Sequence, residues 1–318
     1  MLLPLLSLIV ASGPKPACCC GMAQFASDPA FIAAHLPPVR IHFQAKEGSE
    51  VAFDVLGGEQ GHGFFVPPAK GNKSAIMMFH EWWGLNDNIK NEAERLHNEL
   101  GAAVLAVDLY DGKVTADAQE AGKLMQGMDE ARGEALVRGA LNAVKMGPLD
   151  HARFIGTIGW CFGGGWSDRA AIEGGKDVQA CVIYYGMPST KPEDIARMRA
   201  PVLMFWGTQD GFINAKVVSG FEAAMKSAGK PITTHSFDAP HAFANPSNPR
   251  YNKEAADVSH RETLAFFRAH LKCGAVAQRA LTEPRPTDAK GRTQKRRPLR
   301  RCHRKRKLLR RGQELVSG

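Results

Sequence analysis

The sequence lacks an apolar run long enough to cross a lipid bilayer. Its longest apolar stretch, residues 1–11, has about the length of a signal-peptide core, whereas a membrane-spanning helix takes roughly 20 apolar residues. Hydrophobic residues nonetheless make up 44% of the 318 residues, which is ample for a large core. We therefore expect a globular protein without a transmembrane span.

Cysteine is scarce in the part of the chain where a fold is expected. Of the seven cysteines, three adjoin one another at 18–20 and one lies near the C-terminus, which leaves Cys161, Cys181 and Cys273. Three widely spaced cysteines do not form a disulfide framework, and no pair of Cys or His residues has the short spacing of a zinc site. We expect neither a bound metal nor a cofactor, and we expect Cys181, inside an apolar run, to be a core strand residue.

Most of the chain lacks a net positive charge. The formal net charge is +9, but residues 274–318 carry +12 and the remainder −3. This basic tail is poor in apolar residues, and no aromatic residue follows Phe267, so the tail can neither bury a core nor stack on bases. We expect it to be disordered, with no obligate nucleic acid partner. The alternative is that the tail binds nucleic acid or anionic surfaces by releasing counterions.

Residues 1–37 have features of an N-terminal leader. Small residues near Ala11, Ser12 and Ala17 follow the apolar run and offer a cleavage site, although no cationic residue precedes the run. We expect export to the periplasm or the medium. The alternative is that the protein starts at Met22 and is cytoplasmic.

Residues 38–273 alternate between strand-like and helix-like patterns. Short apolar runs predict buried strands, and apolar residues that recur every three or four positions predict helices. The predicted strands lie at 63–66, 75–79, 103–107, 154–158, 180–185, 202–206 and near 233–237, and the predicted helices at 88–100, 116–127, 130–146, from the turn after 158 to about 172, 215–228 and 254–271. This alternation is typical of α/β proteins with a doubly wound, mostly parallel sheet flanked by helices, whose chemistry lies at the carboxyl ends of the strands.

The most informative motif is Gly159-Trp160-Cys161-Phe162-Gly163, which links an apolar strand to a helix rich in glycine. It has the layout of a nucleophile elbow with cysteine in place of serine, because the two glycines let strand and helix approach while the cysteine takes a strained conformation. The sulfur is then expected near a helix N-terminus, where N–H groups favour a thiolate and bind a developing oxyanion. The alternative is a buried structural cysteine beside a turn.

Two later loops supply the partners of such a nucleophile. Asp210 follows the strand at 202–206, and His241 follows the last predicted strand. Nucleophile, acid and histidine stand in this chain order in the α/β-hydrolase triad, where the histidine accepts the nucleophile's proton and the acid fixes its tautomer. Each residue also has a plainer interpretation, Asp210 as a turn former before glycine and His241, like His235, as a histidine in a polar segment.

The loop after residues 75–79 provides further candidates. We expect the backbone N–H groups of Phe162 and Trp82 to form the oxyanion hole. Glu81 stands beside two tryptophans, which would desolvate its carboxylate, favour its neutral form and let it exchange a proton with a nearby thiol. The alternative is that Glu81 is a solvated loop acid.

Residues from about 45 to 272 resemble the dienelactone hydrolase family, also called carboxymethylenebutenolidase. The matching motifs are His80-Glu81-Trp82-Trp83-Gly84-Leu85-Asn86, Asp108-Leu109-Tyr110, Gly159-Trp160-Cys161-Phe162-Gly163-Gly164, Gly207-Thr208-Gln209-Asp210 and His241-Ala242-Phe243. The resemblance implies an α/β-hydrolase fold, a triad of Cys161, Asp210 and His241, and a Glu81 that holds the thiol at rest and takes its proton when substrate binds. The N-terminal cysteines and residues 25–31 resemble leaders of exported members.

The predicted substrate pocket departs from that family at two positions. Family enzymes that act on dienelactone hold its carboxylate with two arginines, and these positions are occupied here by Gly112 and Asn245. Lys113 is a candidate replacement, although lysine lacks the bidentate fork of arginine. Trp83 and Tyr110 are predicted to line the rest of the pocket. We expect a monomer that hydrolyses a small ester, lactone or thioester through a covalent acyl-enzyme.

Overall fold

The computed structural model describes residues 21–272, which all belong to one compact unit, Met1–Val276. The apolar run of the leader, the cysteines at 18–20, Cys273 and the basic tail lie outside the described residues. The division of the chain at residues 37 and 273 therefore stays a prediction. The described part of the predicted leader packs on the rest of the unit, since Met22 and Phe31 are fully buried.

Eight strands form one sheet, in the order β1-β2-β4-β3-β5-β6-β7-β8. They are β1 (Ser49–Phe53), β2 (Gly61–Val66), β3 (Ser74–Phe79), β4 (Ala103–Val107), β5 (Phe154–Trp160), β6 (Ala180–Tyr184), β7 (Val202–Gly207) and β8 (Ile232–Phe237). The β1–β2 and β2–β4 pairs are antiparallel, and all the others are parallel. The predicted mostly parallel sheet is confirmed. Phe79 pairs with both Val107 and Gly159, so β3, β4 and β5 end at the same edge.

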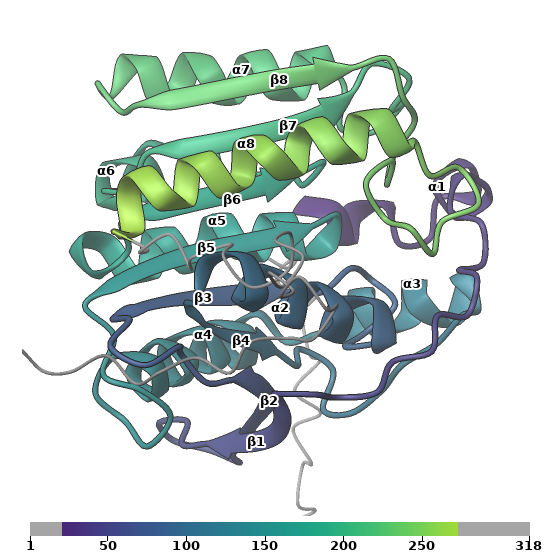
Figure 1. Cartoon of the computed structure of the whole chain (residues 1–318). Coiled ribbons are helices and arrows are strands. Elements are labelled where there is room, and N and C mark those ends of the chain that lie inside the picture. The colour runs from purple at the N-terminus through teal and green to yellow at the C-terminus, as the bar shows by residue number, and fades with distance from the viewer. Residues whose placement is uncertain (1–20, 273–318) are drawn as a thin grey trace, which may run out of the picture. The chain divides into compact units, whose positions relative to one another are not determined.

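Helices cover both faces of the sheet (Figure 1). One face carries α2 (Asp87–Leu100) and α8 (Lys253–Leu271), and the other carries α4 (Glu130–Lys145), α5 (Phe162–Gly174) and α7 (Ala215–Ser227). The shorter elements are η1 (Gly21–Phe25), α1 (Pro29–Ala34), α3 (Ala118–Gly127), η2 (Gly175–Asp177) and α6 (Pro192–Arg197). Figure 1 shows α1 and α3 beyond the arrowheads of the parallel strands, at the edge where the predicted site residues follow those strands.

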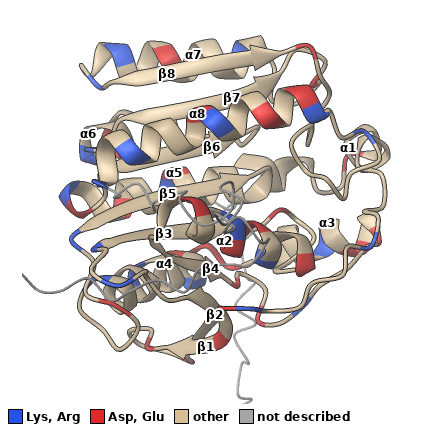
Figure 2. Cartoon of the chain, viewed as in Figure 1, with Lys and Arg blue, Asp and Glu red and all other residues tan. Residues whose placement is uncertain are grey.

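The central strands β3 to β7 contain no charged residue, and Lys, Arg, Asp and Glu lie mainly on helices and loops (Figure 2). Strands buried between two helical layers require such continuous apolar runs. Cys181 is fully buried in β6, as predicted. None of the helices within residues 21–272 is both long and apolar enough to span a membrane.

The sequence patterns missed several short elements. The six-residue α1 and α6 are too short to show helical periodicity, and four of the five residues of β1 are at least partly exposed. The start of α1 does have a local signal, because Asp28 caps the helix by accepting from the Ala30 N–H at 2.7 Å, with Pro29 in the first turn. This helix matters because it reaches the site.

Candidate active site

Cys161 occupies a sharp turn between β5 and α5. Its backbone has φ 55° and ψ −119°, a conformation that residues other than glycine rarely adopt. A Cβ on Gly159 would lie 1.9 Å from the carbonyl oxygen of Gly163, and a Cβ on Gly163 would lie 2.2 Å from that of Phe79. Only glycine at these two positions lets the strand end and the helix start lie so close. The structure thus has a strained turn with cysteine at its apex.

Asp210 and His241 meet at the same edge of the sheet, from the loops after β7 and β8. Asp210 Oδ2 lies 2.5 Å from His241 Nδ1, and Asp210 Oδ1 accepts from the backbone N–H groups of Phe212 at 2.8 Å and Ile213 at 3.0 Å. Both side chains are buried. The carboxylate is therefore fixed by the backbone and in turn fixes the imidazole, which leaves Nε2 as the ring nitrogen available for chemistry.

The charges of this cluster favour a protonated imidazole. Burial acts to lower the pKa of His241, but the Asp210 carboxylate and the Cys161 sulfur outweigh it and raise that pKa well above its ordinary value. Burial acts to raise the pKa of Asp210, and the bonds with His241 and the backbone hold it below its ordinary value instead. The arrangement can therefore take a proton from the thiol and keep it.

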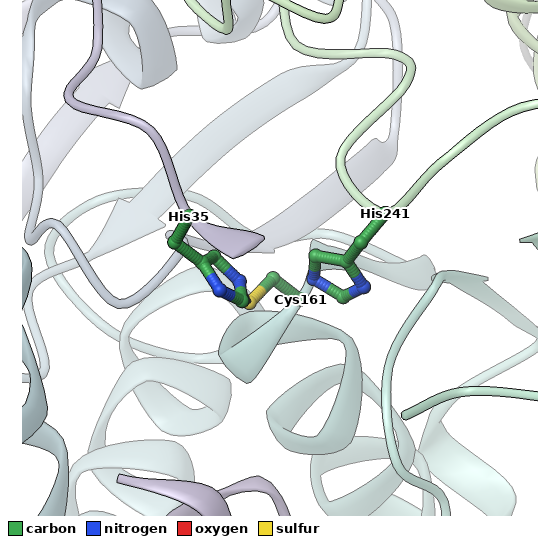
Figure 3. Close-up of side chains that lie close together, drawn as sticks. All are labelled: His35, Cys161 and His241. Atoms are coloured by element: carbon green, nitrogen blue, oxygen red, sulfur yellow. Dashed lines mark hydrogen bonds between the residues drawn. The ribbon is translucent and has the colours of Figure 1, made fainter. Parts of the chain in front are cut away.

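A further histidine, His35, lies at the sulfur, and the sequence patterns did not indicate it. Cys161 Sγ is 3.9 Å from His35 Nε2, and one ring nitrogen of each of His35 and His241 lies with the sulfur in a group whose members are all within 4.8 Å of one another. Figure 3 shows the two rings coming from different segments toward the cysteine. Because 126 residues separate His35 from Cys161, no spacing rule connects them.

His35 is held in its neutral form. Its Nδ1 donates to the carbonyl oxygen of Phe31 at 2.7 Å, so Nε2 carries the lone pair that faces the sulfur. Burial lowers the pKa of His35 to about 3, and the nearby His241 adds to the effect. A neutral imidazole at Cys161 can accept a hydrogen bond from the thiol without adding positive charge.

Residues 29–35, which are α1 and the His35 that follows it, lie over the cysteine, and we call this segment the cover. The Phe31 ring lies edge-on to Trp82 at 5.2 Å and to Phe212 at 4.9 Å between centroids, and the His35 ring lies 4.8 Å from that of His241. Cys161 is consequently 1% exposed. The end of α1 is tied to the loop after β8, because the Arg250 guanidinium donates to the carbonyl oxygen of Ala34 at 3.4 Å.

Glu81 is buried and close enough to His241 for their charges to interact. Its Oε2 accepts a hydrogen bond from the Asn245 side chain, whereas Oε1 has no hydrogen-bond partner. Burial raises the pKa of Glu81 to about 7, although His241 and Asn245 both act to lower it. Glu81 is therefore a desolvated acid, as expected from its two tryptophan neighbours, and its carboxylate is bonded to Asn245 and not to the Cys161 thiol.

The remaining predicted residues have different surroundings. Trp82 is fully buried against His35, with ring centroids 4.5 Å apart, and Trp83 and Tyr110 are also buried. Lys113, the candidate replacement for a missing arginine, is exposed. Phe162 is the first residue of α5, directly after Cys161, and is fully buried, so its N–H lies in the first turn of that helix.

His80 braces the loops that carry these residues. Its Nδ1 donates to the carbonyl oxygen of Glu81 at 2.6 Å, and its Nε2 accepts from the Leu109 N–H at 3.0 Å. Asp108 holds the next turn by accepting from the N–H groups of Tyr110 at 2.9 Å and Gly112 at 2.5 Å. The His-Glu and Asp-Leu-Tyr motifs thus join the ends of β3 and β4.

Comparison with known proteins connects this geometry to one family. A family model described as the dienelactone hydrolase family matches residues 62–271. A protein of Aquifex aeolicus named carboxymethylenebutenolidase is 28% identical over 233 residues, which cover 71% of this chain and 100% of the relative. Protein usf of Aquifex pyrophilus is 28% identical over 232 residues, 70% of this chain and 99% of the relative.

A solved structure titled m3DLH superposes with a TM-score of 0.64 at 26% identity, covering 70% of this chain and 98% of that one. The residues matched by the family model contain Cys161, Asp210 and His241 but not α1 or His35. The cover, residues 29–35, therefore lies outside the part of the chain that the family model describes.

Proposed function

Because this chain belongs to the dienelactone hydrolase family, we propose that it hydrolyses small ester, lactone or thioester bonds with a triad of Cys161, Asp210 and His241. The observation that supports this most directly is the strained turn at Cys161, with a ring nitrogen of His241 within 4.8 Å of the sulfur and Asp210 on the other nitrogen. Nucleophile, base and orienting acid are thus together in one buried cluster.

In the acylation step, His241 Nε2 takes the proton of the Cys161 thiol. The sulfur attacks the carbonyl carbon of the substrate, a C–S bond forms, and the carbonyl electron pair moves onto oxygen. The backbone N–H groups of Phe162 and Trp82 donate to this oxyanion. When the tetrahedral intermediate collapses, the C–O or C–S bond of the substrate breaks, and His241 returns the proton to the leaving alcohol or thiol.

In the deacylation step, His241 takes a proton from water, and the resulting hydroxide attacks the thioester carbonyl. The C–S bond breaks, the acid product leaves, and the thiolate of Cys161 regains a proton from His241. Glu81 is the second proton acceptor in this proposal. A pKa of about 7 and burial beside the cluster suit it to exchange protons near neutrality.

The substrate proposed here needs no carboxylate clamp. Gly112 has no side chain, and Asn245 is 3% exposed and engaged with Glu81. Lys113 is exposed and cannot form the paired hydrogen bonds that a guanidinium gives to a carboxylate. An uncharged ester, lactone or thioester therefore fits the site better than a dienelactone carboxylate.

The test is hydrolysis of p-nitrophenyl acetate and a panel of neutral lactones by the full chain. We expect Cys161→Ala to lower kcat/KM by at least about 10³-fold, because the nucleophile is lost. Cys181→Ala is the matched control, since Cys181 is an equally buried free cysteine in β6. Mass spectrometry after quenching should find the acyl adduct on the peptide that contains Cys161. Equal rates for wild type and Cys161→Ala would rule out the proposed mechanism.

The other candidate function, binding of nucleic acid or anionic surfaces through residues 274–318, has no support from the family match, which ends at residue 271. It predicts salt-sensitive binding that disappears when the tail is deleted. Such binding would add to the hydrolase proposal without replacing it.

A further inference from the structure

Three side chains with the chemistry of metal ligands converge under α1. They are His35, Cys161 and His241, all buried, and each offers one donor atom within 4.8 Å of the other two. Within residues 21–272 this is the one group of three or more such donors. The chain positions are far apart, which is why the spacing of Cys and His residues predicted no metal site.

We propose that this cluster is an inhibitory binding site for a single borderline divalent cation such as Zn²⁺. Zinc binds thiolate and imidazole ligands in a tetrahedral arrangement, and zinc sites with three protein ligands keep the fourth position for water or substrate. Water would complete the coordination here. The site takes the cation as an inhibitor and not as a cofactor, because the sulfur that binds the metal is the one that would attack a substrate.

The donor distances are close to those that zinc requires. Bonds of about 2.3 Å to sulfur and about 2.0–2.1 Å to nitrogen place tetrahedral donors about 3.3 to 3.6 Å apart. The observed separation of Cys161 Sγ and His35 Nε2 is 3.9 Å, and no pair in the group exceeds 4.8 Å. Adjustments of at most about 1.5 Å, within reach of side-chain rotation, would bring all three onto one ion.

Both imidazoles are already oriented as metal ligands usually are. Metal-bound histidines donate their second N–H to a carboxylate or a backbone carbonyl, which fixes the tautomer. His241 Nδ1 lies 2.5 Å from Asp210 Oδ2, and His35 Nδ1 donates to the carbonyl oxygen of Phe31 at 2.7 Å. His241 Nε2 is buried and has no hydrogen-bond partner. Both free nitrogens are therefore available on the side of the sulfur.

The charge and the proton balance are also consistent with a divalent cation. On binding, the Cys161–His241 pair loses its one shared proton to solvent, so that the sulfur binds as a thiolate and His241 Nε2 as a neutral imidazole nitrogen, with no change of oxidation state. The thiolate and the Asp210 carboxylate then supply two negative charges to a buried site that receives two positive ones. The Trp82 ring packs against His35, and the Phe31 ring packs against Trp82, so the cluster has apolar neighbours.

His35 distinguishes this site from a simple Cys-His pair. It lies on the segment that precedes the family match at residue 62, so the third ligand comes from the cover over the site. A cation bound by all three residues would join the cover to the elbow and to the loop after β8. Zinc would thereby hold the cover closed as well as occupy the sulfur.

The experiment is a titration of the full chain with Co²⁺, monitored by thiolate-to-cobalt charge-transfer absorption, followed by displacement with Zn²⁺. The background is the triple substitution of Cys18, Cys19 and Cys20 by serine, which removes adjacent thiols outside the cluster. We expect one equivalent to bind, Cys161→Ala to abolish the band, and His35→Ala to weaken affinity by at least about 100-fold, because a ligand is lost. His35→Gln is a second variant of similar size, and His62→Ala, an exposed histidine, is the control.

A band that persists in Cys161→Ala places the metal elsewhere on the chain and overturns the proposal. A band that is lost in Cys161→Ala but keeps its affinity in both His35 variants overturns the three-ligand site. The absorption needs no substrate, so it is independent of the proposed hydrolysis. Where hydrolysis is observed, Zn²⁺ should inhibit it reversibly by chelation, and the inhibitory concentration should rise by a similar factor in the His35 variants, each compared with its own metal-free rate.

Discussion

At the scale of single residues, Glu81 is penalised for ionising by its burial. Its carboxylate is buried, one oxygen has no partner, and its pKa is raised from 4.5 to about 7. The folded state therefore holds the proton more tightly than the unfolded chain does. By linkage, stability from this group is fully present below about pH 4.5 and is lost as the pH rises through about 7.

Replacing Glu81 by glutamine should remove this pH dependence. Glutamine keeps the shape and the hydrogen bond from Asn245 but cannot ionise, so Glu81→Gln should gain stability relative to wild type between pH 5 and 8. A tenfold change in proton affinity, which is one pKa unit, is worth about 1.4 kcal/mol. The rise in the pKa of Glu81 from 4.5 to about 7 therefore limits the gain in stability over wild type to about 3 kcal/mol. Urea unfolding at several pH values measures it. The exposed Glu59→Gln is the control, and parallel pH profiles for wild type and Glu81→Gln would contradict the assignment.

The candidate site residues that could be predicted are those with a local signal in the sequence. Cys161 was identifiable from the glycines on either side of it, and Asp210 and His241 from their places after strands of a parallel sheet. Glu81 was identifiable as desolvated from its tryptophan neighbours. His35 was not, because its role comes entirely from a contact across 126 residues, and a histidine near a chain's start has no local pattern that indicates it.

At the scale of elements, the turn between β5 and α5 depends on the missing side chain of Gly163. An added Cβ would lie 2.2 Å from the Phe79 carbonyl oxygen and 2.4 Å from that of His80, both backbone atoms that cannot rotate away. Gly163→Ala should therefore lower the free energy of unfolding by at least about 2 kcal/mol, through overpacking. The measurement is chemical denaturation.

The control for this substitution is Gly220→Ala in α7, where a Cβ meets nothing within 4 Å. Alanine in a helix interior is favoured over glycine by up to about 1 kcal/mol, so this variant should be at least as stable as wild type. Similar unfolding midpoints for Gly163→Ala and Gly220→Ala would show that the elbow has more room than the structure indicates.

The longer elements were predictable because their apolar patterns extend over enough residues to identify the period. The strands β3 to β7 and the helices α2, α4, α7 and α8 lie within a few residues of their predicted bounds. Packing against the rest of the fold stabilises the short α1 and α6 and the exposed β1, whose own sequences carry too weak a pattern to predict them. The covering role of α1 could not be predicted from the sequence, since it requires knowing what the helix packs against.

At the scale of the whole molecule, the site is closed by segments from opposite ends of the described chain. Phe31 anchors the cover among Trp82 and Phe212, and removing a buried phenylalanine ring costs about 3 to 5 kcal/mol of packing. Phe31→Ala should thus make local opening easier and speed the alkylation of Cys161 by iodoacetamide at least about tenfold.

Peptide mass spectrometry assigns that alkylation to Cys161 and separates it from the other cysteines. Phe221→Ala is the matched control, because Phe221 is equally buried but lies in α7. It should lower global stability without speeding the reaction under native conditions. The same acceleration in both variants would mean that the thiol becomes accessible by global unfolding and not by movement of the cover.

The cover controls access to Cys161 both for substrate and for oxidants. A cysteine that is 1% exposed is shielded from peroxide as well as from substrate, because both must contact the sulfur to react with it. A looser cover would raise the rate of substrate capture and the rate of irreversible oxidation together. In the proposed mechanism, the packing of Phe31 and His35 therefore sets a single compromise between the rate of catalysis and the lifetime of the reactive thiol.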